Sequence, residues 1–93
     1  MLSNFDLDDF NMIDMDAKKV LEVLAGFGKG EFVKGYQIHK ETGLIPEVIN
    51  EAVKALEKSL LVSNVKVSEN LPPYDFYAVE ITDFGRQVLE RFG

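Results

Sequence analysis

The chain has 93 residues, of which 46% are hydrophobic and 28% are charged, with no cysteine and one histidine. This length and composition predict a single small globular domain, and they exclude a disulfide framework, a thiolate metal site and a zinc cluster. The formal net charge of −6 argues against a strongly basic nucleic-acid binder, because binding to a polyanion depends mainly on Lys and Arg.

The charge is distributed unevenly, which weakens the argument from net charge. Residues 1–16 contain five Asp and neither Lys nor Arg, so the rest of the chain is close to neutral. The N-terminus has no basic lead followed by the apolar core of a signal peptide, and no run of about 18 apolar residues occurs. We therefore expect a cytoplasmic protein with no membrane segment.

Residues 1–15 form the first predicted unit, an acidic and apolar arm ahead of a domain that covers residues 16–93. Asp alternates in this arm with large apolar side chains. One interpretation is a segment that packs on its own domain or on a partner copy, and the other is a disordered interaction segment. The sequence leaves both interpretations open.

Two helices are predicted next. The first begins near Asp16, which we take as its cap, and ends at the glycine-rich residues 26–30. Its apolar residues recur at helical spacing: Val20, Leu21, Leu24 and Phe27. The glycine run resembles a phosphate-binding loop, but it closes a helix instead of opening one. A short second helix covers residues 36–41 and ends at Gly43, where glycine can adopt a left-handed conformation.

A third helix is predicted over residues 46–59, with Pro46 in its first turn and Leu44 in the core before it. Its inward side is expected to be apolar and includes Ile49, Val53, Leu56 and Leu60. Its outward side is expected to be polar and includes Glu47, Asn50, Glu51, Lys54 and Lys58.

Residues 61–67 and 76–81 alternate in a way that predicts an antiparallel hairpin. The connection, residues 68–75, is long for a hairpin turn, and we expect it to project as a wing. Its Pro72-Pro73-Tyr74 is interpreted as a loop with a packed tyrosine. Thr82 is then expected to cap a last helix. The apolar stripe of that helix includes Phe84, Val88, Leu89 and Phe92.

Three helices, a hairpin and a closing helix, in this order, resemble the winged helix-turn-helix family over residues 16–92. Thr42-Gly43-Leu44 ahead of Pro46 is similar to the turn before the recognition helix of that family. Ile81-Thr82-Asp83-Phe84-Gly85-Arg86 is similar to the start of the last helix in MarR-type and PadR-type regulators. The resemblance implies an α+β, mostly α fold, and a small transcriptional regulator that reads duplex DNA with the helix of residues 46–59.

The resemblance also implies which residues contact DNA, because the helix after the turn enters the major groove while the wing meets phosphate. The corresponding residues are Lys40, Ile45, Glu47, Val48, Asn50, Glu51, Lys54 and Lys66. A domain of this size buries only about 60–65% of its unfolded surface, so a homodimer is an expected source of further stability. The dimerisation residues expected from the arm and the last helix are Phe5, Phe10, Ile13, Val88, Leu89 and Phe92.

Glu47 and Glu51 depart from this DNA-binding pattern, because phosphate repels carboxylates and their desolvation is costly unless they are paired. The alternative is a winged-helix protein–protein interaction module with little or no DNA affinity, in which Ile45 and Val48 are exposed beside the two carboxylates. We do not expect an enzyme, because no nucleophile is arranged with His39. No catalytic residue, metal or cofactor is assigned.

Overall fold

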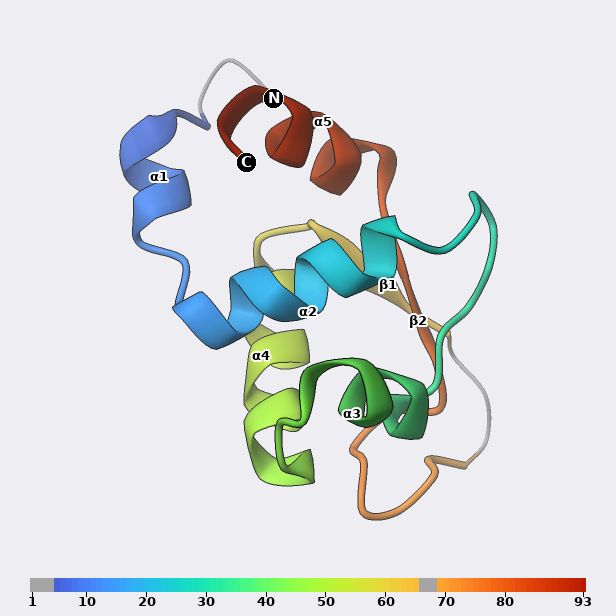
Figure 1. Cartoon of the computed structure of the whole chain (residues 1–93). Coiled ribbons are helices and arrows are strands. Elements are labelled where there is room, and N and C mark those ends of the chain that lie inside the picture. The colour runs from blue at the N-terminus through green and yellow to red at the C-terminus, as the bar shows by residue number, and fades with distance from the viewer. Residues whose placement is uncertain (1–4, 66–68) are drawn as a thin grey trace.

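The computed structural model describes residues 5–65 and 69–93. Over these residues the chain is α+β and mostly helical, with 55% of residues in five helices, and it has one two-stranded antiparallel sheet (Figure 1). The helices are α1 (Leu7–Asn11), α2 (Met15–Ala25), α3 (Gly35–Thr42), α4 (Pro46–Lys58) and α5 (Asp83–Phe92), and the strands are β1 (Val62–Asn64) and β2 (Val79–Ile81). The α+β, mostly helical class predicted from the sequence is confirmed.

Helix α2 lies at the centre of the molecule, with α3 and α4 on one side of it and α5 on the other (Figure 1). Because apolar residues recur every three or four positions, each helix has one apolar side, and these sides meet in a common core. The buried residues of α2 and α4 include Val20, Leu21, Leu24, Ile49, Val53 and Leu56. Burial of each such side chain contributes about 1.5–3 kcal/mol, so the contact between α2 and α4 is a major source of stability.

Two helix ends differ from the prediction. The cap of α2 is Asp14 and not Asp16, because the carboxylate of Asp14 accepts a hydrogen bond from the N–H of Asp16 at 3.0 Å. After α4, Leu60 does not continue the inward stripe, since it is 70% exposed and has a left-handed φ of 65°. The next residue, Leu61, is buried, and its N–H donates to the carbonyl oxygen of Leu56 at 2.9 Å. The helical spacing of buried residues thus ends at Leu56, and Leu60, which the sequence pattern places on the inward side, faces solvent.

The sheet is a short hairpin with a third neighbour. Strand β1 pairs antiparallel with β2, with Val62 opposite Ile81, and each strand has three residues. The predicted hairpin is confirmed, but its strands are shorter than predicted; residues 66 and 67 lie outside the described residues. On the other side of β2, Val33 and Val79 exchange two backbone hydrogen bonds at 2.7 and 2.9 Å. The sequence pattern did not indicate this bridge.

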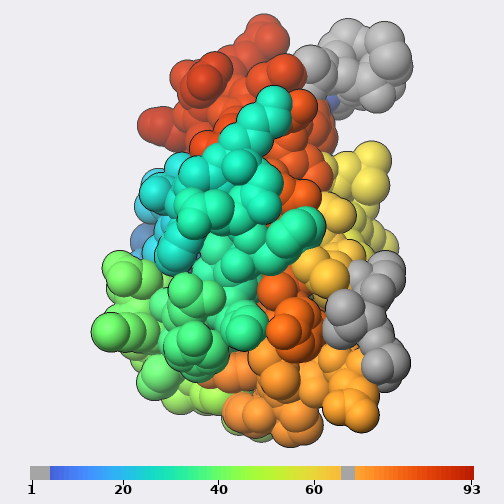
Figure 2. Space-filling model, turned by 90° about the vertical axis from the view of Figure 1, so that its right-hand side faces the viewer, coloured from blue at the N-terminus to red at the C-terminus, as the bar shows by residue number. Residues whose placement is uncertain are grey.

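The connection between the strands folds back against the helices over its described residues, so the prediction of a projecting wing is wrong there. Tyr74 and Phe76 are buried, with their ring centres 5.8 Å apart. Figure 2 shows this segment (orange) beside α3 (green). Gly35 permits the close approach, because a Cβ at that position would lie 2.3 Å from Cγ of Tyr74. The prediction of a packed tyrosine is confirmed.

The described part of the N-terminal arm packs on α5 of its own chain. Asp6 caps α1, and Asp6 and Asp9 each accept a hydrogen bond from the backbone N–H of the other. The ring centre of Phe5 lies 5.4 Å from that of Phe84, and Phe10 lies 5.8 Å from Phe92. Of the two interpretations of the arm, the structure corresponds to a segment that packs on its own domain.

The residues predicted for dimerisation take part in this same packing. Phe10 and Val88 are buried, whereas four others are half-buried against the core: Phe5, Ile13, Leu89 and Phe92. The rings of Phe5 and Phe10 pack on Phe92 of α5 within one chain, and Phe10 and Val88 have almost no surface left to offer to a second copy. Homodimerisation and its contact residues stay predictions, and the burial of Phe10 and Val88 within one chain weighs against these two.

Candidate functional site

The turn between α3 and α4 fixes the direction of α4. Gly43 has a left-handed φ of 75°, which glycine adopts without a steric penalty. The hydroxyl of Thr42 donates to the carbonyl oxygen of Ile38 at 2.8 Å and accepts from the N–H of Leu44 at 3.1 Å. His39 Nδ1 lies 2.7 Å from the carbonyl oxygen of Leu44. The single histidine is therefore part of the turn that sets the start of α4.

The structure places the predicted DNA-contacting residues in different settings. Those with exposed side chains are Lys40, Ile45, Glu47, Glu51 and Lys54. Val48 and Asn50 are half-buried. Lys66 lies outside the described residues. The exposed outer side of α4 thus carries two carboxylates of the predicted set and one ammonium group, and Lys40 is on α3.

The side chain of Asn50 is already engaged within the chain. Its Nδ2 donates to the carbonyl oxygen of Pro73 at 3.1 Å, and its Oδ1 accepts from the N–H of Asp75 at 2.9 Å. These two bonds hold the connection between the strands against α4. An amide reads adenine by offering a donor and an acceptor together, and both functions of Asn50 are used here. The predicted role of Asn50 in base reading conflicts with this geometry.

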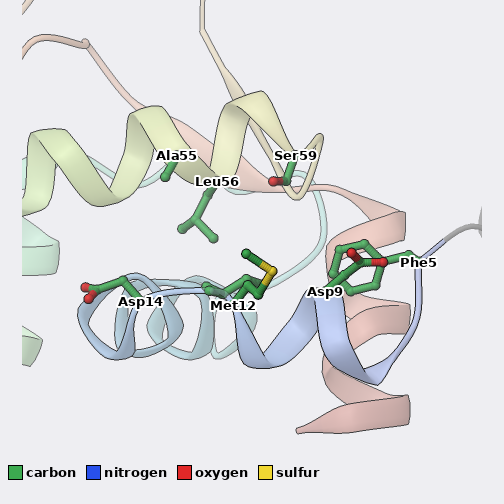
Figure 3. A pocket seen from close by; sticks show the side chains of 8 residues that line it. Phe5, Asp9, Met12, Asp14, Ala55, Leu56 and Ser59 are labelled. Atoms are coloured by element: carbon green, nitrogen blue, oxygen red, sulfur yellow. The ribbon is translucent and has the colours of Figure 1, made fainter.

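Two hollows lie along the edge of α4 away from Asn50, where α4 faces α1 and the start of α2. Each has a volume of about 540 Å³. They share Asp14 and Ala55 in their linings, and together we call them the α4 groove. Figure 3 shows the first hollow, with Met12 lying between its own segment and Leu56 of α4. The second hollow continues toward the start of α4 and is lined by residues that include Ile45 and Val48.

The α4 groove combines an apolar surface with negative charge. Its carboxylates are Asp9, Asp14, Asp16, Glu47 and Glu51, and its apolar residues include Met12, Ile13, Ile45, Val48 and Ala55. Neither Lys nor Arg lines either hollow. Lys54 and Lys58 are exposed on α4 but are not in these linings. The groove is therefore a negatively charged surface on a chain whose residues 17–93 are close to neutral.

Three of these carboxylates also have local structural roles. Asp14 caps α2, Asp16 lies in the first turn of α2, and Glu47 lies in the first turn of α4. Acidic side chains at these positions complement the positive ends of the helix dipoles. The same placement brings the starts of two helices, each with its acids, to the two sides of one groove. A structural preference thus concentrates negative charge at one place on the surface.

Sequence reasoning identified the α4 side of this groove but missed the other side. Ile45, Glu47, Val48 and Glu51 were singled out, whereas Met12, Asp14 and Asp16 were assigned to an arm or to a helix start. One signal was present, because Ala52 and Ala55 are small residues that follow Val48 at helical spacing. Small residues on a helix surface leave room for a neighbour, and here they form part of the lining.

The guanidinium of Arg86 is used for hydrogen bonds within the chain. It donates to the carbonyl oxygens of Ala25 at 3.2 Å and Phe27 at 2.9 Å, at the end of α2. These carbonyl groups lack helical partners, and a positive charge at a helix C-terminus is favourable. Arg86 therefore ties α5 to α2.

Within residues 5–65 and 69–93, no group of three or more His, Cys, Asp or Glu is placed to hold a metal ion. None of the helices in that part of the chain has the length and apolar character needed to cross a membrane. Comparisons with protein-family models, with curated proteins and with solved structures find no match to this chain.

Proposed function

We propose that the chain is a winged-helix interaction module that binds a protein partner in the α4 groove. The order of helices, hairpin and closing helix supports the winged-helix assignment. The observation that carries the function is an apolar lining with five carboxylates, two of which lie on α4, the helix that DNA-binding members of the resembled family use for recognition. An apolar centre with a polar rim is the usual anatomy of a protein interface.

The DNA-binding regulator is the rival proposal, and two observations weigh against it. Asn50 uses its donor and its acceptor on Pro73 and Asp75. Glu47 and Glu51 are exposed in the lining of the groove, which contains no Lys or Arg, so phosphate approaching this edge of α4 would be repelled by negative charge that no cation of the lining offsets. Among the described residues of the predicted DNA-contacting set, Lys40 and Lys54 are the exposed cations, and affinity based on these two contacts would be weak and sensitive to salt.

Photo-crosslinking separates the two proposals. A photoreactive phenylalanine analogue replaces Ile45, which is 53% exposed at the edge of the groove, and a second variant carries the same analogue in place of the exposed Glu90 on α5. Illumination in cells of the natural source is expected to give protease-sensitive adducts from position 45 and fewer from position 90. Adding Glu47→Lys and Glu51→Lys to the position-45 variant is expected to abolish the adducts.

Each outcome has a definite meaning. Nuclease-sensitive adducts at position 45 would support the DNA-binding regulator and overturn the interaction module. The absence of any position-45 adduct above the position-90 level would also overturn the interaction module. Titration of mixed duplex DNA at low salt provides an independent check, with no binding expected for the parent chain.

A further inference from the structure

We propose that the occupant of the α4 groove is a cationic amphipathic helix of another protein. This inference rests on the proposed function and specifies the chemistry of the partner. Its starting point is that the two hollows adjoin along α4, because Asp14 and Ala55 line both of them. Helix α4 has 13 residues, which corresponds to about 20 Å at 1.5 Å per residue. An occupant of similar length makes three to four helical turns.

The apolar surface of the groove is accessible to such an occupant. Met12 is 84% exposed and Ile45 is 53% exposed, and they belong to the linings of different hollows. Met side chains adapt their shape to different partners. Ala55 lies between the two hollows and leaves space for a partner side chain. This distribution matches a helix that presents anchors at positions i, i+3 or i+4, and i+7.

The charge of the groove determines the charge of the partner. All ionisable side chains in the two linings are carboxylates: Asp9, Asp14, Asp16, Glu47 and Glu51. Lys and Arg flanking an apolar stripe would meet them at the rim, where each exposed pair contributes little by itself but the set favours fast and selective association. A second copy of this chain is a poor occupant, since residues 1–16 hold five Asp and no base while residues 17–93 hold 10 bases and 11 acids, so neither part offers an excess of positive charge. Charge complementarity therefore points to a different, basic protein.

The secondary structure of the occupant follows from what lines the groove. The lining consists of side chains from α4, α1, the start of α2 and the segments adjoining these helices. The described strands β1 and β2 contribute no residue to it, so an extended peptide would find no strand edge with which to pair. Unpaired backbone groups buried against apolar side chains are costly, whereas a helix satisfies its backbone groups internally. A helix is thus the favoured form.

The test uses three synthetic peptides of about 16 residues, which span about 24 Å as helices. The first has Leu at i, i+3, i+4 and i+7 spacing with Lys at the flanking positions. The second has the same composition in an order that destroys the apolar stripe, and the third replaces every Lys of the first by Glu. Fluorescence anisotropy with the full chain is expected to show at least about tenfold tighter binding of the first peptide than of either control.

Variants of the chain test whether the peptide binds in the α4 groove. Glu47→Lys combined with Glu51→Lys is expected to weaken binding of the first peptide at least about tenfold. Glu41→Lys combined with Glu90→Lys changes the net charge equally and is expected to weaken that binding less than about threefold. Ala55→Arg is expected to abolish binding by filling the centre of the groove with a long cationic side chain. All of these side chains are exposed, and circular dichroism verifies that each variant folds.

The outcomes distinguish this inference from the proposed function. Equal binding of the first and second peptides would overturn the amphipathic helix, and equal binding of the first and third would overturn the cationic partner. Equal weakening by the two double variants would overturn the groove as the location. If position 45 forms protein adducts but the first peptide fails to bind, the interaction module stands and the cationic helix is wrong. If both fail, the two fall together.

Discussion

The side-chain oxygen of Asn50 accepts a hydrogen bond from the backbone N–H of Asp75 at 2.9 Å, and its amide group donates to the carbonyl oxygen of Pro73 at 3.1 Å. A residue on the helix expected to read DNA is thus committed to holding a loop of its own chain. The role of Asn50 can therefore be tested by measuring the stability of the domain.

Asn50→Ala is expected to lower the free energy of unfolding by about 0.5–1.5 kcal/mol, because it removes the two hydrogen bonds that hold the loop of Pro73 and Asp75 against α4. Urea denaturation measures the change. The control is Lys54→Ala on the same helix, which is exposed and expected to alter stability by less than about 0.5 kcal/mol. An unchanged midpoint for Asn50→Ala would contradict the proposed role of the side chain.

Gly35→Ala is expected to destabilise the domain by about 1–3 kcal/mol or more, because the added Cβ would lie 2.3 Å from Cγ of Tyr74. Gly43→Ala is the matched comparison. Nothing lies within 4 Å of a Cβ at position 43, so its cost of about 1 kcal/mol arises only from the left-handed φ of 75°. Thermal denaturation that ranks Gly43→Ala as the more damaging change would contradict the close approach of Tyr74.

Phe10→Ala is expected to cost about 3–5 kcal/mol, since it removes a ring that is 8% exposed and packs on Phe92. Because the contact lies within one chain, the molecular mass in solution is expected to be the same for the parent and the variant. Light scattering coupled to size-exclusion chromatography measures the mass. A parent dimer that becomes a monomer on Phe10→Ala would support the prediction that Phe10 lies in a dimer interface.

Arg86→Met is expected to reduce stability by about 1–3 kcal/mol, because a charged group that donates to the carbonyl oxygens of Ala25 and Phe27 is lost while most of the apolar stem is kept. Amide exchange in the last turn of α2 is expected to accelerate together with this loss. Gln87→Met on the same helix is exposed and serves as the control. Equal effects of the two changes would remove the capping role.

The sequence was a good guide wherever local periodicity decides the structure. Ile49, Val53 and Leu56 are buried as predicted, Gly43 ends α3 in a left-handed conformation, and Thr82 caps α5 by accepting from the N–H of Gly85 at 2.9 Å. In each case the relevant partners are within a few residues along the chain. Such features follow from helix geometry and from side-chain chemistry alone.

Prediction failed where the deciding partner is distant in sequence. The projecting wing was wrong because Gly35 leaves space for Tyr74, and neither residue reveals the other in a single sequence. The bridge between Val33 and Val79 could not be recognised from an alternating pattern, because it involves a single residue on the Val33 side and alternation needs several. The far side of the α4 groove was missed for the same reason: Met12 and Asp14 face α4 only after the chain has folded back.

The position of Val79 has a consequence for how the protein opens. Its backbone N–H and carbonyl group both bond to Val33, while the carbonyl oxygen of the preceding Ala78 accepts from Val65 on the other side. A single short strand therefore joins three stretches of chain that are far apart in sequence. The amide of Val79 is released when its bridge to Val33 opens, and because both side chains are fully buried this opening disturbs the core, so its hydrogen should exchange slowly with solvent.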